Sequence, residues 1–260
     1  MENRELNEFL NDFCGIDGIQ ALALGGSRTT ERADEKSDYD FYVYSENGID
    51  QEIRHKILTK YCKYFELGNN YWELEDNGQL KCGIDFDLVY RNLRQFENTV
   101  ADVVENNNSY NGFTTCLWSN VLNSTIIFDK NDAFKKIKDR FTIPYPQKLK
   151  ENIIKRNMTL LSGSVVSYDK QIIKTIYRKD LVNLNNRVSA FLASYFDVIF
   201  AINELPHPGE KRIMEICLNK CKILPNGFER NVNSLIQNMN NNESIMGIIK
   251  NIVFELKGIL

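Results

Sequence analysis

A glycine turn that precedes a strand with two alternating aspartates constrains this chain more than any other feature. The apolar run 21–24 is typical of the end of a strand, and Gly25-Gly26-Ser27 follows it directly. Glycine lets a backbone approach a ligand closely, and the amides that follow can face phosphate oxygens. Ten residues separate Ser27 from Asp38. Asp38 and Asp40 then alternate with Tyr39 and Phe41 on a second strand. The alternation puts both carboxylates on one face, roughly 6.6 Å apart along the chain, where they can share divalent cations.

This order of glycine turn, spacer and Asp-x-Asp strand resembles the signature of the nucleotidyltransferase superfamily with a polymerase-β-like catalytic domain. In this chain the signature runs from Gly26-Ser27 to Asp38-Tyr39-Asp40. The motif match covers roughly residues 19–90, and the architecture is similar to that of the aminoglycoside and lincosamide nucleotidyltransferases. Glu31 stands where a glycine often follows the Gly-Ser turn, so the detailed path of the turn is left open.

The resemblance implies three carboxylates that bind metal ions. Asp38 and Asp40 would hold two Mg²⁺ ions roughly 3.5 to 4 Å apart, with phosphate oxygens completing the coordination. The family's third carboxylate lies on a later strand, where Asp85 is the best match and would ligate the second ion. Asp85 is also a candidate for the base that takes the acceptor's proton, and Asp87 is a second candidate. An exposed aspartate at a strand end is the alternative interpretation of Asp87.

The expected co-substrate is a nucleoside triphosphate, with ATP favoured. The residues expected to bind it are Gly26, Ser27, Arg28, Lys211 and Arg212. The last two follow Pro208, which can occupy the first turn of a new helix. Cations and amides near such a helix start can hold phosphate oxygens, although an ordinary helix start is the alternative. His207 is interpreted as a capping or packing residue rather than a catalyst.

Composition indicates an ordinary globular enzyme and excludes several classes. The 260 residues are 43% hydrophobic and 26% charged, no apolar run approaches a membrane span, and the N-terminus does not resemble a signal peptide. We therefore expect a cytoplasmic protein without membrane contact. The six cysteines form no Cys-x-x-Cys pair, and the two histidines add little, which disfavours structural zinc.

The organisation of the chain changes near Pro144 and Pro146. Before them short strands alternate with helices, and after them the apolar spacing is helical to the end. We predict an α+β arrangement: a nucleotidyltransferase domain with a mixed β-sheet over residues 1–143, then an all-helical domain over 144–260 that binds substrate or nucleotide. The first part carries 16 Lys and Arg against 25 Asp and Glu, and the second carries 16 against 10. An acidic half that holds metal ions and a basic half that meets phosphates fit nucleotide binding, although lysine-bearing helix surfaces explain the charges equally well.

The expected strands and helices of the first part follow from its hydrophobic pattern. They are helices over 2–13, 49–61 and 93–106, and strands over 19–24, 40–44, 64–67, 71–74, 80–90 and 125–128. In the helical part, the segment Asp180–Glu204 has a broad apolar face and an opposite stripe of Asn183, Arg187, Ala190, Ser194 and Asp197. Such a stripe suits the wall of a cleft, and a plain solvent face is the alternative. Trp72 is interpreted as a core residue, or else as a stacking surface for a base.

The expected reaction is adenylyl transfer from ATP to a hydroxyl of a small molecule such as an antibiotic, with release of pyrophosphate. The alternatives are a protein-modifying transferase of the AMPylating antitoxin type and an inactive nucleotide-binding protein. A nucleic-acid acceptor is disfavoured, because the basic half has no dense Lys/Arg cluster with interleaved aromatics. Whether a homodimer completes the site is left open.

Overall fold

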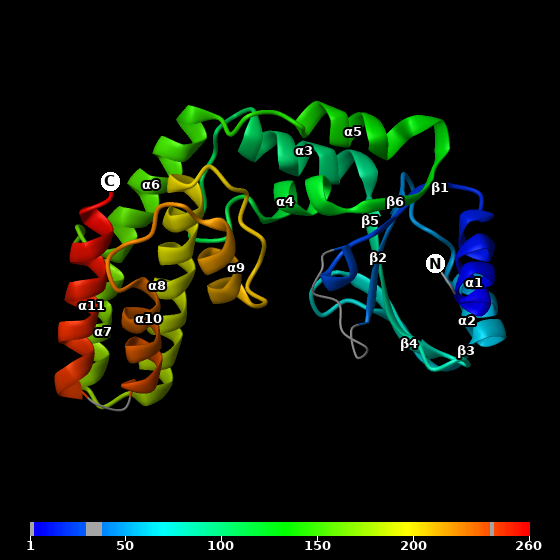
Figure 1. Ribbon diagram of the computed structural model, residues 1–260. Coiled ribbons are helices and arrows are strands. Elements are labelled where there is room, and N and C mark those ends of the chain that lie inside the picture. Colours follow the sequence, from blue (N-terminus) through cyan, green and yellow to red (C-terminus); the bar gives the residue numbers. More distant parts are fainter. Residues whose placement is uncertain (1–2, 30–37, 240–241) are drawn as a thin grey trace. The chain divides into compact units, whose positions relative to one another are not determined.

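The computed structural model describes residues 3–29, 38–239 and 242–260 (Figure 1). The chain forms two compact units. The first consists of Met1–Val100 and Asn120–Ile143, and the second consists of Ala101–Ser119 and Pro144–Leu260. The predicted change at residue 144 coincides with one of these boundaries. The segment Ala101–Ser119, which the prediction placed in the first domain, groups with the helices instead.

The six described strands of the first unit form one mixed sheet in the order β3-β4-β5-β2-β1-β6 (Figure 1). Their bounds are β1 Ile19–Leu24, β2 Tyr39–Ser45, β3 Cys62–Asn69, β4 Leu74–Leu80, β5 Asp85–Asn92 and β6 Thr125–Asp129. Among these strands only β2 and β5 pair in parallel. The predicted mixed sheet is therefore confirmed.

Two helices cover one face of this sheet. They are α1 (Arg4–Cys14) and α2 (Gln51–Tyr61), and each begins at a capping side chain, Asn3 or Asp50, that accepts hydrogen bonds from the first-turn amides. Apolar residues at helical spacing on α1 pack against alternate residues of β2 and β5 in one buried cluster. The members from α1 and these strands are Leu6, Phe9, Leu10, Phe13, Phe41, Val43, Phe86, Leu88 and Tyr90.

The opposite face is covered by helices at one end only. Tyr44 of β2 packs against Phe96 of α3 (Leu93–Val104) and stacks on Phe134 of α5 (Ala133–Phe141), with ring centroids 5.2 and 4.8 Å apart. Toward the start of β2 the same face carries polar side chains. The packed aromatic end thus anchors the strands that present those polar groups.

The segment between β3 and β5 differs from the prediction. Residues 71–73 form the turn of a hairpin rather than a strand, and β4 occupies a stretch that looked like a connection. The pattern hid this strand because Glu75, Asn77 and Gln79 point to the polar face, so no apolar alternation marks it. The core interpretation of Trp72 is wrong, since 87% of this residue is exposed.

A buried ion pair fixes the middle of β4 on the core side of the sheet. Asp76 accepts hydrogen bonds from Arg54 Nη1 of α2, Tyr90 Oη and the Gly68 amide, each 2.7 Å long. Asp76 and Arg54 are both buried. A carboxylate with this many donors is compensated for its loss of water.

The second unit is helical, as predicted. Its main helices are α6 Gln147–Leu161, α7 Tyr168–Tyr177, α8 Leu181–Ile202, α9 Ile213–Lys220, α10 Phe228–Gln237 and α11 Asn242–Lys257. One apolar cluster joins them, with α8 supplying the largest share of its members. Within the described part of the chain, no helix is both long and apolar enough to cross a membrane.

Two of the five residues in the polar stripe of α8 are buried, and the other three are half-buried. Ser194 and Asp197 are buried, and Asp197 accepts hydrogen bonds from the Thr114 amide, Thr114 Oγ1 and Asn157 Nδ2 at 3.0, 2.6 and 3.0 Å. Burial raises the pKa of Asp197 to about 6, and these donors oppose that rise. Residues that looked like a ligand surface therefore pin the segment around Thr114 to α6 and α8.

The segment that was expected to start a helix at Pro208 is irregular and ends in a turn, and α9 begins five residues later at Ile213. His207 explains the delay: it is fully buried, its amide donates to Thr115 Oγ1 at 2.7 Å, and its Nδ1 accepts from the Gly209 amide. Its ring also packs on Phe113 and Phe200. The packing role predicted for His207 is confirmed.

Candidate functional site

The parallel pairing of β2 with β5 aligns four aspartates on the polar face of the sheet. Asp40 lies directly opposite Asp87 in register, and Asp38, one residue before β2, lies at the level of Asp85. Paired residues of neighbouring strands point to the same face, with backbones roughly 4.8 Å apart. The intervening Phe86 points to the core, which leaves the carboxylates on the other side.

The glycine turn lies against the second of these carboxylates. Gly26 has φ +63°, and a Cβ built on it would lie 1.6 Å from Asp40 Oδ2 and 2.6 Å from Asp40 Cγ. The Gly25 amide donates to the Asp40 carbonyl at 2.8 Å. The side chain of Asp40 thus occupies the space that any other residue at position 26 would need, and the turn and the carboxylate form one surface.

Beyond the turn, residues Ser27–Thr29 form a short 3-10 helix, η1. Thr29 closes it through its amide and Oγ1, which donate to the Gly26 carbonyl at 3.4 and 3.0 Å. The guanidinium of Arg28 lies 3.9 Å from the ring centroid of Tyr39, the residue between the two predicted metal ligands. The expectation about Glu31 lies outside the described residues.

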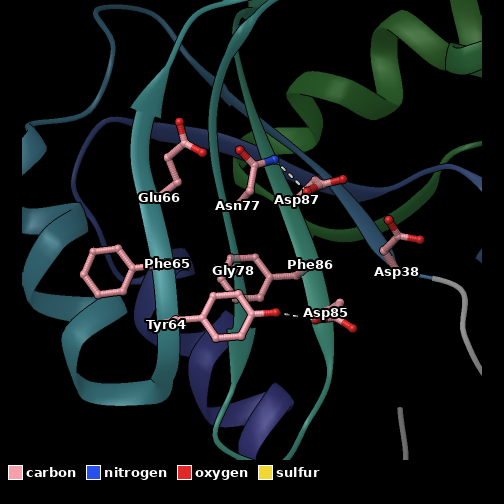
Figure 2. A pocket seen from close by; sticks show the side chains of 9 residues that line it. All are labelled: Asp38, Tyr64, Phe65, Glu66, Asn77, Gly78, Asp85, Phe86 and Asp87. Carbon is pink, nitrogen blue, oxygen red and sulfur yellow. Dashed lines mark hydrogen bonds between the residues drawn. The ribbon is translucent and has the colours of Figure 1, made fainter.

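Two amide side chains of β4 face the carboxylates of β5. Asn77 Nδ2 donates to Asp87 Oδ1 at 2.6 Å (Figure 2). Gln79 Nε2 donates to Asp85 Oδ1 at 3.0 Å. Tyr64 Oη of β3 also approaches Asp85 Oδ1, at 3.4 Å. No local sequence pattern marks these residues, because only the register of the hairpin brings them beside the aspartates.

Most of these side chains, but not Gln79, line a pocket of about 370 Å³ on the polar face (Figure 2). Its lining residues come from the start of β2 and from β3, β4 and β5: Asp38, Tyr64, Phe65, Glu66, Asn77, Gly78, Asp85, Phe86 and Asp87. The structure thus brings Asp38 and Asp85 to one pocket. Asp40 is not among its lining residues and faces the glycine turn instead.

One cation on this face is committed to another acid. Arg91 of β5 donates to both carboxylate oxygens of Glu73 at 2.7 and 2.6 Å, and to Asn120 Oδ1 at 3.1 Å. Its guanidinium also lies over the Tyr42 ring. Within the described residues, neither Asp38, Asp85 nor Asp87 forms an ion pair with a lysine or arginine.

The donor set suits a hard divalent cation. Mg²⁺ in phosphate-transfer sites takes one or two carboxylates and fills its remaining positions with phosphate oxygens and water. Among the described residues no three His, Cys, Asp or Glu side chains are grouped to hold a metal ion by themselves. The carboxylates on this face are the kind of ligand that such an ion takes.

The two remaining predicted nucleotide ligands belong to the helical unit. Lys211 and Arg212 are exposed residues of the turn that precedes α9, and Arg212 has φ +54°. They do not lie within a helical first turn as expected. Their part in nucleotide binding stays a prediction.

Comparison with known proteins finds a family match in the first part of the chain. Residues 6–109 match the family model described as "Nucleotidyltransferase domain". The chain is also similar to a nucleotidyltransferase-like protein from Exiguobacterium sibiricum, with TM-score 0.47 and 11% identity over 98% of this chain and 75% of the other. An aminoglycoside 6-adenyltransferase from Bacillus subtilis matches with TM-score 0.29 and 10% identity over 100% and 92% of the two chains. No curated protein matches the sequence.

Proposed function

We propose that the chain transfers a nucleoside monophosphate from a nucleoside triphosphate to a hydroxyl of a small molecule. The match of residues 6–109 to the family model "Nucleotidyltransferase domain" supports this reaction class. ATP is the proposed donor and pyrophosphate the leaving product. The observation that carries the proposal is the contact between the Gly26 turn and Asp40, with Asp87 in register beside it. A phosphate-binding turn next to carboxylates is the arrangement that nucleotidyl transfer requires.

The turn and the carboxylates have separate roles in this proposal. Backbone amides at Gly26 and Ser27 hold the β and γ phosphates, and Asp38 and Asp40 hold Mg²⁺, proposed as two ions. Bound Mg²⁺ neutralises phosphate charge and orients the oxygens around the α-phosphorus. Catalysis then consists mainly of positioning the donor and acceptor and of compensating charge.

The strand register changes the proposed third ligand. The family resemblance favours Asp85, but Asp87 is the cross-strand neighbour of Asp40, and Asp85 lies one step further toward the exposed strand end. We therefore assign the third metal ligand to Asp87 and leave Asp85 to face the acceptor. In the transfer step the acceptor oxygen bonds to the α-phosphorus, the bond from the α-phosphorus to the bridging oxygen breaks, and Asp85 takes the hydroxyl proton.

A pyrophosphate-release assay with each nucleoside triphosphate, Mg²⁺ and a panel of hydroxyl-bearing antibiotics and metabolites tests the proposal. Mass spectrometry of the acceptor should show one added nucleoside monophosphate, and chelation of Mg²⁺ should remove it. An added mass on a protein of a cell extract would instead support the protein-modifying alternative. Nucleotide binding without any transferred mass in either assay would contradict the transferase proposal and leave the inactive nucleotide-binding protein.

A further inference from the structure

The amide of Asn77 uses all of its hydrogen-bonding groups on the polar face. Its Nδ2 donates to Asp87 Oδ1 at 2.6 Å and to Glu75 Oε2 at 3.3 Å, and its Oδ1 accepts from Asn69 Nδ2. Both hydrogens and the carbonyl oxygen are therefore used. Because Asn69 occupies the oxygen, the NH₂ group of Asn77 must face Asp87.

This contact holds the Asp87 carboxylate in one orientation. A hydrogen bond from an amide to an ionised carboxylate is shorter and stronger than one between neutral groups. Oδ1 of Asp87 is thereby occupied, whereas Oδ2 accepts no hydrogen bond from the described residues. In Figure 2 the carboxylate of Asp87 extends from its contact with Asn77 toward the side where Asp38 lies.

Asp85 provides an internal comparison. Its amide partner Gln79 lies two residues from Asn77 on the same face of β4, but the bond is 3.0 Å long and exposed, whereas that of Asn77 is partly buried. Asp85 Oδ1 accepts hydrogen bonds from two donors, Gln79 Nε2 and Tyr64 Oη, so Gln79 is not its only partner. The hydrogen bond from Gln79 therefore constrains its carboxylate less.

We propose that Asn77 is a positioning residue for metal and nucleotide binding: it fixes one oxygen of Asp87 and leaves the other directed at the ligand. This inference rests on the proposed function of the site, because it takes Asp87 as a metal ligand. Asn77 itself touches neither metal nor nucleotide in this role.

Electron paramagnetic resonance of Mn²⁺ in the presence of a non-hydrolysable ATP analogue measures the affinity of the protein for the metal ion, without catalytic turnover. Asn77→Ala should weaken Mn²⁺ binding in the ternary complex about tenfold. Asn77→Asp, which keeps the shape but turns a carboxylate toward Asp87, should weaken it at least as much. Gln79→Ala is the matched control and should stay within about twofold of wild type. Circular dichroism and thermal unfolding establish which variants are folded.

The two substitutions separate positioning from packing. If Asn77 served only to fill space, the isosteric Asn77→Asp would bind Mn²⁺ like wild type while Asn77→Ala would not, and the proposal would be overturned. Wild-type affinity in both folded variants would overturn it as well. Asp87→Asn tests the premise that Asp87 is a metal ligand. If the folded Asp87→Asn variant bound Mn²⁺ and nucleotide as tightly as wild type, the result would contradict the proposed site and not merely the role of Asn77.

Discussion

The two faces of one sheet treat acidic side chains in opposite ways. On the core face, Asp76 is buried with Arg54 and two further donors, so the protein itself compensates its charge. On the polar face, Asp38, Asp85 and Asp87 have no cation among the described residues. Strands β4 and β5 contribute to both faces by simple alternation. The difference indicates which carboxylates stabilise the fold and which are left for a ligand.

The largest expected effect comes from removing one charge of the polar face. Asp40→Asn should lower kcat/KM for nucleotidyl transfer at least about 1000-fold, or ~4 kcal/mol, because it removes a ligand of the phosphate-bound ion. Thermal unfolding should change little. Asp17→Asn, at an exposed aspartate of the same unit, is the control and should retain activity. A folded Asp40→Asn enzyme with near wild-type turnover would contradict the metal assignment.

Removing a charge from the core face should lower the stability of the fold instead. Arg54→Met leaves the buried charge of Asp76 without its cation, and we expect the free energy of unfolding to fall by roughly 3 kcal/mol or more. Urea denaturation followed by circular dichroism measures the loss. Lys60→Met, which breaks the exposed ion pair with Asp12, should lower the free energy of unfolding far less, because water screens exposed charges. Equal losses in the two variants would show that burial does not distinguish these pairs.

The glycine turn can be tested with two residues that share a backbone conformation. Gly26 and Gly48 have φ of +63° and +77°, but only a Cβ at Gly26 would meet another side chain, that of Asp40. Both substitutions to alanine should lower the free energy of unfolding by about 1 kcal/mol, because alanine disfavours a left-handed backbone. Gly26→Ala alone should also lower kcat/KM, by about 100-fold or ~2.7 kcal/mol, since Asp40 must move. Similar activity in both variants would separate the turn from the site.

The helical unit holds a third kind of acid, buried with hydrogen-bond donors but without an ion pair among the described residues. The pKa of Asp197 is raised to about 6 in the folded protein, above the ~3.9 of an unfolded chain. The folded state therefore binds more protons between these values, and the free energy of unfolding should fall by about 2 kcal/mol as pH rises from ~4 to ~6, then level off. Fluorescence of the buried Trp118 reports on this unit.

Asp197→Asn provides the control for this pH dependence. The substitution should abolish the part of the fall between pH 4 and 6 that comes from Asp197, because the amide does not titrate. An unchanged pH profile in a folded Asp197→Asn protein would assign the dependence to other groups. Both proteins, wild type and Asp197→Asn, are compared by their free energy of unfolding at each pH.

Local patterns predicted much of the fold. The strand β1 has the predicted bounds of Ile19–Leu24, β2 and β6 differ by a residue or so at their ends, and the helical character after Pro146 is confirmed. These elements alternate or repeat apolar residues in their own sequence. β4 and α5 escaped prediction: β4 carries polar residues toward the site, and α5 is short and rich in lysine.

The sequence by itself determined the glycine turn, the alternating Asp38 and Asp40 and the reaction class that they indicate, because these depend on neighbouring residues and on a spacing along one chain segment. Only the tertiary structure decided that Asp87 lies beside Asp40, that Asn77 holds Asp87, and that Asp40 fills the space above Gly26. Strand register joins segments almost fifty residues apart, and a shift of one residue would turn every side chain to the other face. Such long-range pairing is set by the packing of the whole core, which no local pattern contains.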